Sequence, residues 1–193
     1  GTFNRESDWV HDDKNKTDSG YAECIDVIGD LVDFSRQQGV TFLVETYVNN
    51  VIGSVEETLR LFSDINNPHL GLLMDPTNYF EVHNIGKMDD VLNHMFNALS
   101  DKIHMAHAKD VKLAESGGGV KMSAQDASES HTLRGVGSID LPAPGLGSLN
   151  YSLYLKRLAK DHSNIPVIIE HLEEEDVPRA KKFLDSKFLE LGV

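Results

Sequence analysis

The apolar positions of this chain follow two spacings that alternate along it. From Tyr21 to Gln38 apolar residues recur every three or four positions, which predicts a helix that Gly39 ends. Short runs that are apolar at consecutive positions predict buried strands between the helical stretches. There are four such runs: VTFLVE (40–45), HLGLLMD (69–75), KIHMAHAK (102–109) and IPVIIEH (165–171).

A helical pattern follows each predicted strand. In the first, SVEETLRLFSDI, Ser54 takes the N-cap position and Glu57 the third helical position, as in a capping box. Strands that are apolar on both faces and alternate with helices are typical of a parallel α/β sheet. Two architectures fit, an open doubly wound sheet and part of a (β/α)₈ barrel. The remaining predicted helices are MDDVLNHMFNALS (88–100), SLNYSLYLKRLAKD (148–161) and VPRAKKFLDSKFLEL (177–191).

Each predicted strand closes on a residue that can bind a metal: Glu45, Asp75, His107 and Glu170. Active sites of parallel α/β proteins form at this end of the strands. Four strand ends converge on one point when the sheet curls around a barrel axis, whereas an open sheet would spread them in a row. We therefore expect an α/β fold that forms the C-terminal half, strands 5–8 with their helices, of a (β/α)₈ TIM barrel, because only four of eight strands are present. Residues 1–193 form one partial barrel domain in this interpretation.

Three carboxylates and one imidazole suit one divalent metal ion, with Mn²⁺, Mg²⁺ or Co²⁺ favoured and Zn²⁺ compatible. Such an ion polarises a carbonyl group and stabilises an enediolate. Glu45 and Glu170, on the fifth and eighth strands of the expected barrel, would flank the ion. One carboxylate could then remove a proton from a carbon and the other return a proton to its opposite face, as an epimerase requires.

The segments LVET, LLMDPTNYF, HMAHAKD and VIIEH, with GVGSIDLP and PGLGSLNY, resemble the xylose-isomerase-like barrel superfamily and its sugar isomerase/epimerase branch, which includes D-tagatose 3-epimerase. The resemblance implies that Glu45, Asp75, His107 and Glu170 bind one divalent ion and that the two glutamates act as acid and base. It also implies that the substrate is a small sugar or related polyol, and that the protein assembles as a homo-oligomer or associates with the missing half-barrel.

Several of these residues have a second interpretation. Asp75 precedes Pro76, and Asp-Pro commonly begins a turn. His104 is a rival ligand to His107; three residues apart on a strand they should face opposite ways, so we expect His104 to pack outward against the helices. The long Gly-, Ser- and Pro-rich segment 111–147 is either a lid or a disordered loop.

Two further residues are candidates for substrate binding. Asn78 follows Asp75 by three positions, where members of the family place a substrate-contacting His or Asn, but it could also cap a turn. Lys109 belongs to an H-x-K-D pattern with His107, and it could hold a substrate oxygen or lie in solvent.

Composition narrows the functional classes. The formal net charge is −13, which disfavours nucleic acid and anionic membranes as partners. Cys24 is the single cysteine, so no internal disulfide can form and a reducing compartment, the cytoplasm, is expected. No apolar run approaches the length of a membrane span, and residues 1–20 lack the apolar core of a signal peptide.

Three alternatives to the isomerase stay open. An endonuclease IV-like abasic-site nuclease belongs to the same superfamily, but its pattern has a His where Asn78 stands, and Glu129 and His131 match its Asp-x-His only in part. An inosose-type dehydratase is also compatible with the resemblance. A non-catalytic truncated barrel, acting as a binding or assembly module, would account for the four absent strands.

Overall fold

A computed structural model of the chain describes residues 1–114, 133–134 and 139–193. Its centre is a parallel four-stranded sheet in the order β1-β2-β3-β7. Neighbouring strands follow one another in chain order across the sheet, as they do in a barrel wall. In a doubly wound sheet the strand order would reverse partway across. The predicted strands are therefore confirmed, with these bounds: β1 (Phe42–Glu45), β2 (Leu70–Met74), β3 (Ile103–Ala108) and β7 (Val167–Ile169).

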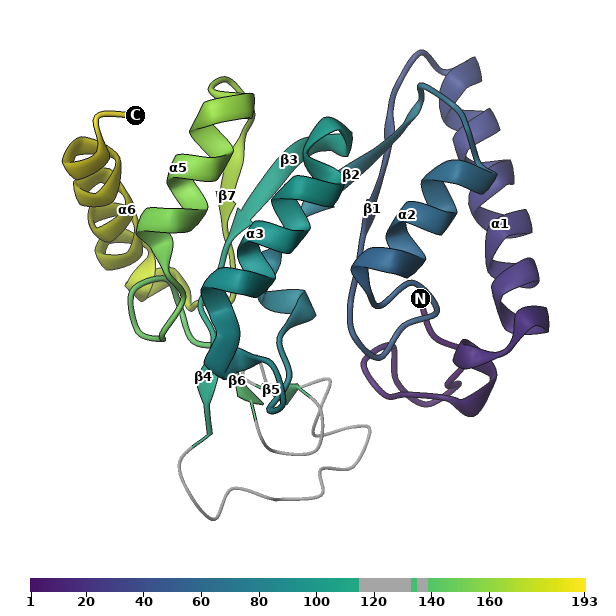
Figure 1. Ribbon diagram of the computed structural model, residues 1–193, viewed down its shortest axis with the longest axis horizontal. Helices are drawn as coiled ribbons and strands as arrows, with labels where there is room; N and C mark the ends of the chain where they lie inside the picture. Colours follow the sequence, from purple (N-terminus) through teal and green to yellow (C-terminus); the bar gives the residue numbers. More distant parts are fainter. Residues whose placement is uncertain (115–132, 135–138) are drawn as a thin grey trace.

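The helices cover one face of this sheet (Figure 1), with α2, α3 and α5 in front of the strands and α1 and α6 at the two sides. Helix α1 begins three residues before the predicted start, because the Thr17 side chain caps it by accepting from the Gly20 N–H at 3.0 Å. No helix in the described ranges is long and apolar enough to cross a membrane. The helices are α1 (Asp18–Gln37), α2 (Val55–Asp64), α3 (Met88–Leu99), α5 (Tyr151–His162) and α6 (Val177–Leu191); short 3₁₀ turns are η1 (Asp13–Lys16), η2 (Pro76–Tyr79), η3 (Ile85–Lys87), η4 (Ser100–Lys102) and η5 (Glu174–Asp176).

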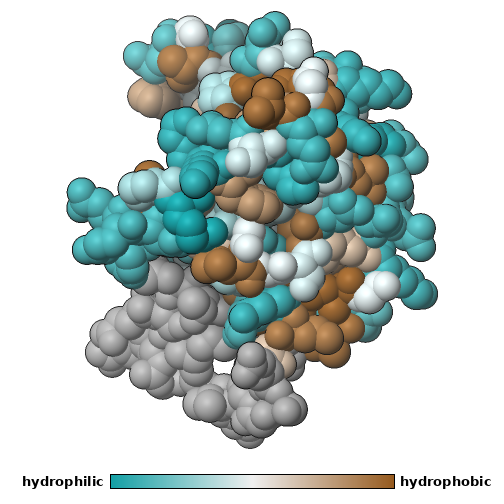
Figure 2. Space-filling model, turned by 90° about the vertical axis from the view of Figure 1, so that its left-hand side faces the viewer, coloured by the Kyte–Doolittle hydropathy of each residue, from teal (hydrophilic) through white to brown (hydrophobic). Residues whose placement is uncertain are grey.

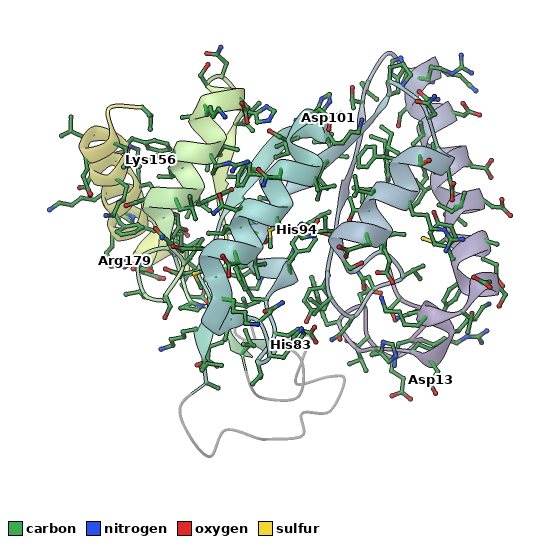
Figure 3. All side chains as sticks on the ribbon, in the orientation of Figure 1. Asp13, His83, His94, Asp101, Lys156 and Arg179 are labelled. Carbon is green, nitrogen blue, oxygen red and sulfur yellow. The ribbon has the colours of Figure 1, made fainter. Side chains whose placement is uncertain are left out.

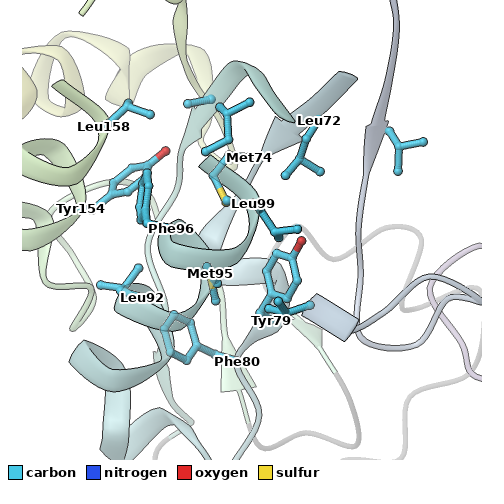
Figure 4. Packing of buried hydrophobic residues seen from close by; sticks show 14 of the residues in the cluster. Leu72, Met74, Tyr79, Phe80, Leu92, Met95, Phe96, Leu99, Tyr154 and Leu158 are labelled. Atoms are coloured by element: carbon cyan, nitrogen blue, oxygen red, sulfur yellow. The ribbon is translucent and has the colours of Figure 1, made fainter. Parts of the chain in front are cut away.

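The hydrophobic core lies between the sheet and these helices (Figure 4). Leu72 and Met74 leave β2 on its helical face and are fully buried. Burial of each such side chain stabilises the fold by about 1.5–3 kcal/mol, so this layer fixes the position of the strands. The helices contribute the fully or almost fully buried residues Leu92, Met95, Phe96, Leu99, Tyr154 and Leu158.

The opposite face of the sheet is the inner face of the barrel wall. Alternation along each strand places Leu43 beneath Glu45, Leu73 beneath Asp75 and Ile168 beneath Glu170. Ile168 is 43% exposed although it lies on a strand. In the described residues β1 pairs only with β2, and β7 only with β3, so the wall has two open edges. The chain thus supplies four parallel strands of a barrel that needs eight.

The expectation for His104 is wrong. The pairing of β2 with β3 shifts between Leu72 and Leu73, so that Ile103 pairs with Leu72 and Met105 with Leu73. This irregularity places one extra residue, His104, in β3 and breaks the simple alternation of side chains. The His104 ring is exposed and lies beside Gly71, where a Cβ atom would collide with it. It therefore does not pack against the helices.

A second, small antiparallel sheet lies beyond the carboxyl end of β3 (Figure 1). It has the order β4-β6-β5, with strands β4 (Lys112–Leu113), β5 (Leu133–Arg134) and β6 (Ile139–Asp140). These strands belong to the segment 111–147 for which only a loop was predicted. Residues 115–132 and 135–138, on which the lid interpretation depends, lie outside the described part, as do Glu129 and His131.

Candidate metal centre

The structure brings Glu45, Asp75, His107 and Glu170 together at the carboxyl ends of the four strands. One ligand atom from each lies within 4.8 Å of the other three. The Nδ1 atom of His107 is 3.3 Å from Glu45 Oε1, 3.8 Å from Asp75 Oδ2 and 3.2 Å from Glu170 Oε2. Asp75 and His107 are buried, Glu170 is half-buried and Glu45 is exposed, so the cluster is open on one side.

Asp75 caps a turn with one carboxylate oxygen and faces the cluster with the other. Its Oδ1 atom accepts from the Thr77 N–H at 2.9 Å and from the Thr77 hydroxyl at 2.7 Å, which caps the turn η2. Its Oδ2 atom points the other way, into the cluster, 3.8 Å from His107 Nδ1. The turn therefore holds the carboxylate in the orientation that a ligand needs.

Asn78 and Lys109 complete the cluster as a polar layer. The Asn78 amide donates to Glu45 Oε1 at 2.8 Å, and its carbonyl oxygen accepts from Lys109 Nζ at 3.2 Å. Lys109 Nζ is also 2.5 Å from Asp75 Oδ2 and 3.0 Å from Glu170 Oε2. Lys109 is buried, so it is not the solvated lysine of the second interpretation.

The charges in the cluster shift two pKa values strongly. Burial alone lowers the pKa of His107, but the carboxylates of Asp75, Glu170 and Glu45 outweigh it and raise that pKa to about 11. Burial alone raises the pKa of Glu170, but His107 and Lys109 outweigh it and lower that pKa to about 2. In the metal-free protein an imidazolium and an ammonium therefore hold the carboxylates together.

The donor set fits a divalent cation. Nδ1 of His107 and Oε2 of Glu170 are buried, and within the described residues they lack hydrogen bonds of standard geometry although they form the ion-pair contacts above. Such under-satisfied buried atoms, aimed at one another, are suited to coordinating an ion. Three carboxylates and one imidazole match Mg²⁺, Mn²⁺ or Co²⁺, and also Zn²⁺.

Two buried tyrosines that sequence reasoning did not single out support the strand end behind this cluster. From α5, Tyr154 donates to the His107 carbonyl at 2.9 Å, and Tyr151 donates to the Lys109 carbonyl at 3.0 Å. Helical spacing cannot identify this role, because the backbone carbonyls that the two hydroxyls reach are brought to them by the fold.

Histidines elsewhere in the described chain do not join the cluster. His83 and His94, labelled in Figure 3, lie on the surface and approach Glu81 and Glu56 at 3.7 and 3.0 Å. Each faces a single carboxylate, which is a surface ion pair and not a ligand set.

Comparison with known proteins identifies the fold. A family model described as xylose isomerase-like TIM barrel matches residues 6–187. Among curated proteins, none matches the chain.

Three solved structures illustrate the similarity. The probable 3-DHS dehydratase AsbF, involved in petrobactin synthesis in Bacillus anthracis, is 16% identical with a TM-score of 0.63, over 97% of this chain and 61% of its own. A xylose isomerase-like TIM barrel protein from Mycobacterium smegmatis in complex with magnesium is 16% identical with a TM-score of 0.63. The match covers 95% of this chain and 54% of that protein. A D-allulose 3-epimerase from Methylomonas sp. is 17% identical with a TM-score of 0.53. The match covers 88% of this chain and 49% of the epimerase. The chain thus spans about half the length of these structures.

Proposed function

The chain belongs to the xylose isomerase-like TIM barrel family, and on this premise we propose that it forms the metal-binding half of an isomerase or epimerase that acts on a sugar or related polyol. The observation that carries the proposal is the convergence of Glu45, Asp75, His107 and Glu170 from four separate strands within 4.8 Å. The similarity to an epimerase and to a magnesium complex supports it.

The four residues would hold one divalent ion, whose positive charge would stabilise the negative charge that develops on substrate oxygens. The chain's own residues would move the protons. Glu45 ends one edge strand of the sheet and Glu170 directly follows the other, so they approach the centre from opposite sides. One would remove the proton next to a substrate carbonyl and the other would return a proton.

Asn78 and Lys109 would position the substrate. Lys109 is buried beside the carboxylates of the cluster and donates to the Asn78 carbonyl oxygen, while the Asn78 amide donates to Glu45. An ammonium and an amide can both donate to hydroxyl or carbonyl oxygens of a polyol. Burial of these groups would favour substrates that supply matching acceptors.

The direct test is Glu170→Gln, which keeps the size of the side chain and removes its basicity. We expect the variant to retain Mn²⁺ through the other three ligands, with turnover of an accepted ketose reduced by about 10²–10⁴-fold. Glu174→Gln, on the exposed turn η5, changes the same charge nearby and should leave turnover unchanged. Full turnover by a metal-loaded Glu170→Gln variant would refute the acid–base role.

Product analysis on the same ketose panel separates the alternatives. An isomerase or epimerase that works by proton transfer incorporates solvent deuterium at the carbon next to the carbonyl without loss of water. A dehydratase, the activity in the name of one structural neighbour, gives a product lighter by one water. Cleavage of abasic DNA would indicate the nuclease, which a net charge of −13 disfavours. Metal binding without turnover would favour the non-catalytic module.

We also propose that the site is completed by further barrel strands, supplied by a complementary half-barrel or by a second copy. The open edges of β1 and β7 leave backbone groups without strand partners in the described chain. Figure 2 shows apolar patches on the side of the molecule that carries α6. Val177 and Leu189 of α6 and Val193 after it are exposed, and Ile168 of β7 is exposed on the inner face of the sheet. Light scattering should therefore find an assembly, and a stable monodisperse monomer would refute this association.

A further inference from the structure

Strand pairing stops one residue before Lys109. Strand β3 ends at Ala108, so the backbone of Lys109 lies beyond the last strand pairing. The peptide that links Lys109 to Asp110 is instead held by residues 142–151. Its carbonyl accepts from the Tyr151 hydroxyl at 3.0 Å, and its N–H donates to the Pro142 carbonyl at 3.1 Å. Both polar groups of this peptide are thus fixed by the segment that leads into α5.

The carboxylate of Asp110 is the centre of this arrangement. It is buried, and its Oδ1 atom accepts from the N–H groups of Val111 at 2.8 Å and Leu149 at 2.9 Å. Its Oδ2 atom accepts from the Gly145 N–H at 2.9 Å. Hydrogen bonds from backbone amides to a buried carboxylate are strong, because the acceptor is charged.

The segment around this carboxylate is shaped to receive it. A Cβ atom at Gly147 would collide with the Asp110 carboxylate, so only glycine allows this approach. Gly145 has a φ of +84°, the left-handed region that favours glycine. Arg179 of α6, labelled in Figure 3, donates to the Pro144 carbonyl at 2.9 Å and holds the segment from outside.

We propose that Asp110 is a positioning residue for Lys109: by binding the backbone of residues 145–149, it places the Lys109 ammonium between Asp75 and Glu170. The inference rests on the proposed function in one respect, that these carboxylates are metal ligands. The ammonium, 2.5 Å from Asp75 Oδ2 and 3.0 Å from Glu170 Oε2, then competes with the ion for two of its four ligands. The position of Lys109 thereby sets the affinity of the site.

The first test needs no metal and uses the full chain. Lysines of the chelator-treated protein are acetylated with acetic anhydride, and the rate at Lys109 is compared with that at the exposed Lys181 by mass spectrometry. Lys109 should react slowly in the wild type, and Asp110→Asn should raise its relative rate about tenfold, because the amide turns a donor toward backbone N–H groups. Asp30→Asn, an exposed change of the same charge on α1 that leaves the partner of Lys181 in place, is the matched control.

Tyr151→Phe covers the case in which Asp110→Asn does not fold. It removes the hydroxyl that holds the Lys109 carbonyl, leaves the ring packing in place and changes no charge. It should also raise the relative rate of Lys109. If a folded Asp110→Asn variant leaves Lys109 protected, or if only Tyr151→Phe folds and leaves it protected, the proposal is overturned.

The second test is a double-mutant cycle on the Mn²⁺ dissociation constant. Lys109→Met should lower this constant about tenfold by removing the competing cation, and Asp110→Asn should lower it in the same direction. In the Lys109→Met background, Asp110→Asn should have no further effect. An equal effect in both backgrounds, or no effect of Lys109→Met, overturns the proposal, because Asp110 would then act on the fold alone. A wild type that binds no Mn²⁺ refutes the proposed function instead, and the acetylation test still decides the role of Asp110.

Discussion

Metal binding should release a proton from His107, and this coupling gives the proposed centre an unusual pH dependence. The surrounding carboxylates raise the His107 pKa to about 11, whereas an ordinary histidine has a pKa of about 6.5. An ion can bind Nδ1 only after the proton leaves. The dissociation constant for Mg²⁺ or Mn²⁺ should therefore fall about tenfold for each pH unit between about pH 7 and pH 9.

Calorimetry in buffers that differ in ionisation heat measures both the affinity and the proton count. We expect about one proton released per ion at pH 8, where an ordinary histidine would already be neutral. His107→Asn should bind more weakly and without the pH slope, since an amide oxygen has no proton to lose. His104→Asn, three residues away on the same strand, should keep the slope. A flat affinity above pH 7.5 with no proton release would refute the electrostatic description of the centre.

The same pKa shift predicts a stability trend of defined sign. Because the pKa of His107 is raised in the folded state, the imidazolium stabilises the metal-free protein fully below about pH 6.5. That stabilisation is lost as the pH rises toward about 11. The melting temperature of the chelated protein should therefore decline over this window, while that of the Mg²⁺-saturated protein should decline less.

Three substitutions test the fold around the centre by urea denaturation. Gly147→Ala should lower the free energy of unfolding by about 1–3 kcal/mol, because the added methyl group meets the Asp110 carboxylate. Tyr154→Phe should lower it by about 1–3 kcal/mol, because the buried His107 carbonyl loses its donor. Ser54→Ala should lower it by about 1 kcal/mol through loss of the N-cap of α2, and unchanged midpoints would contradict each assignment.

The strands and the place of the cluster could be predicted because both depend on local rules. Apolar runs identify buried parallel strands, and a polar residue at each carboxyl end must lie at one rim of the sheet. The structure brings Glu45, Asp75, His107 and Glu170 to that rim. Their roles in metal binding and catalysis stay predictions that the tests above address.

What could not be predicted depends on contacts between distant segments. His104 was misplaced because the irregular pairing of β3 arises from its neighbour β2 and leaves no mark in the β3 sequence. The function of the Asp110 carboxylate depends on amides that come from residues 145–149, far along the chain. The short strands β4, β5 and β6 are too brief for any periodicity to reveal.

The two carboxylate oxygens of Asp75 have different partners, which limits the residues that can replace it. An asparagine could still receive both Thr77 donors with its single oxygen, so the turn would form as before. Its amide nitrogen, a hydrogen-bond donor, would then face the ammonium of Lys109 and the ring of His107, two groups that need an acceptor. The longer side chain of a glutamate would carry its carboxylate past the two Thr77 donors of the turn. Substitution by asparagine would thus keep the turn and weaken the cluster that we propose as the metal site.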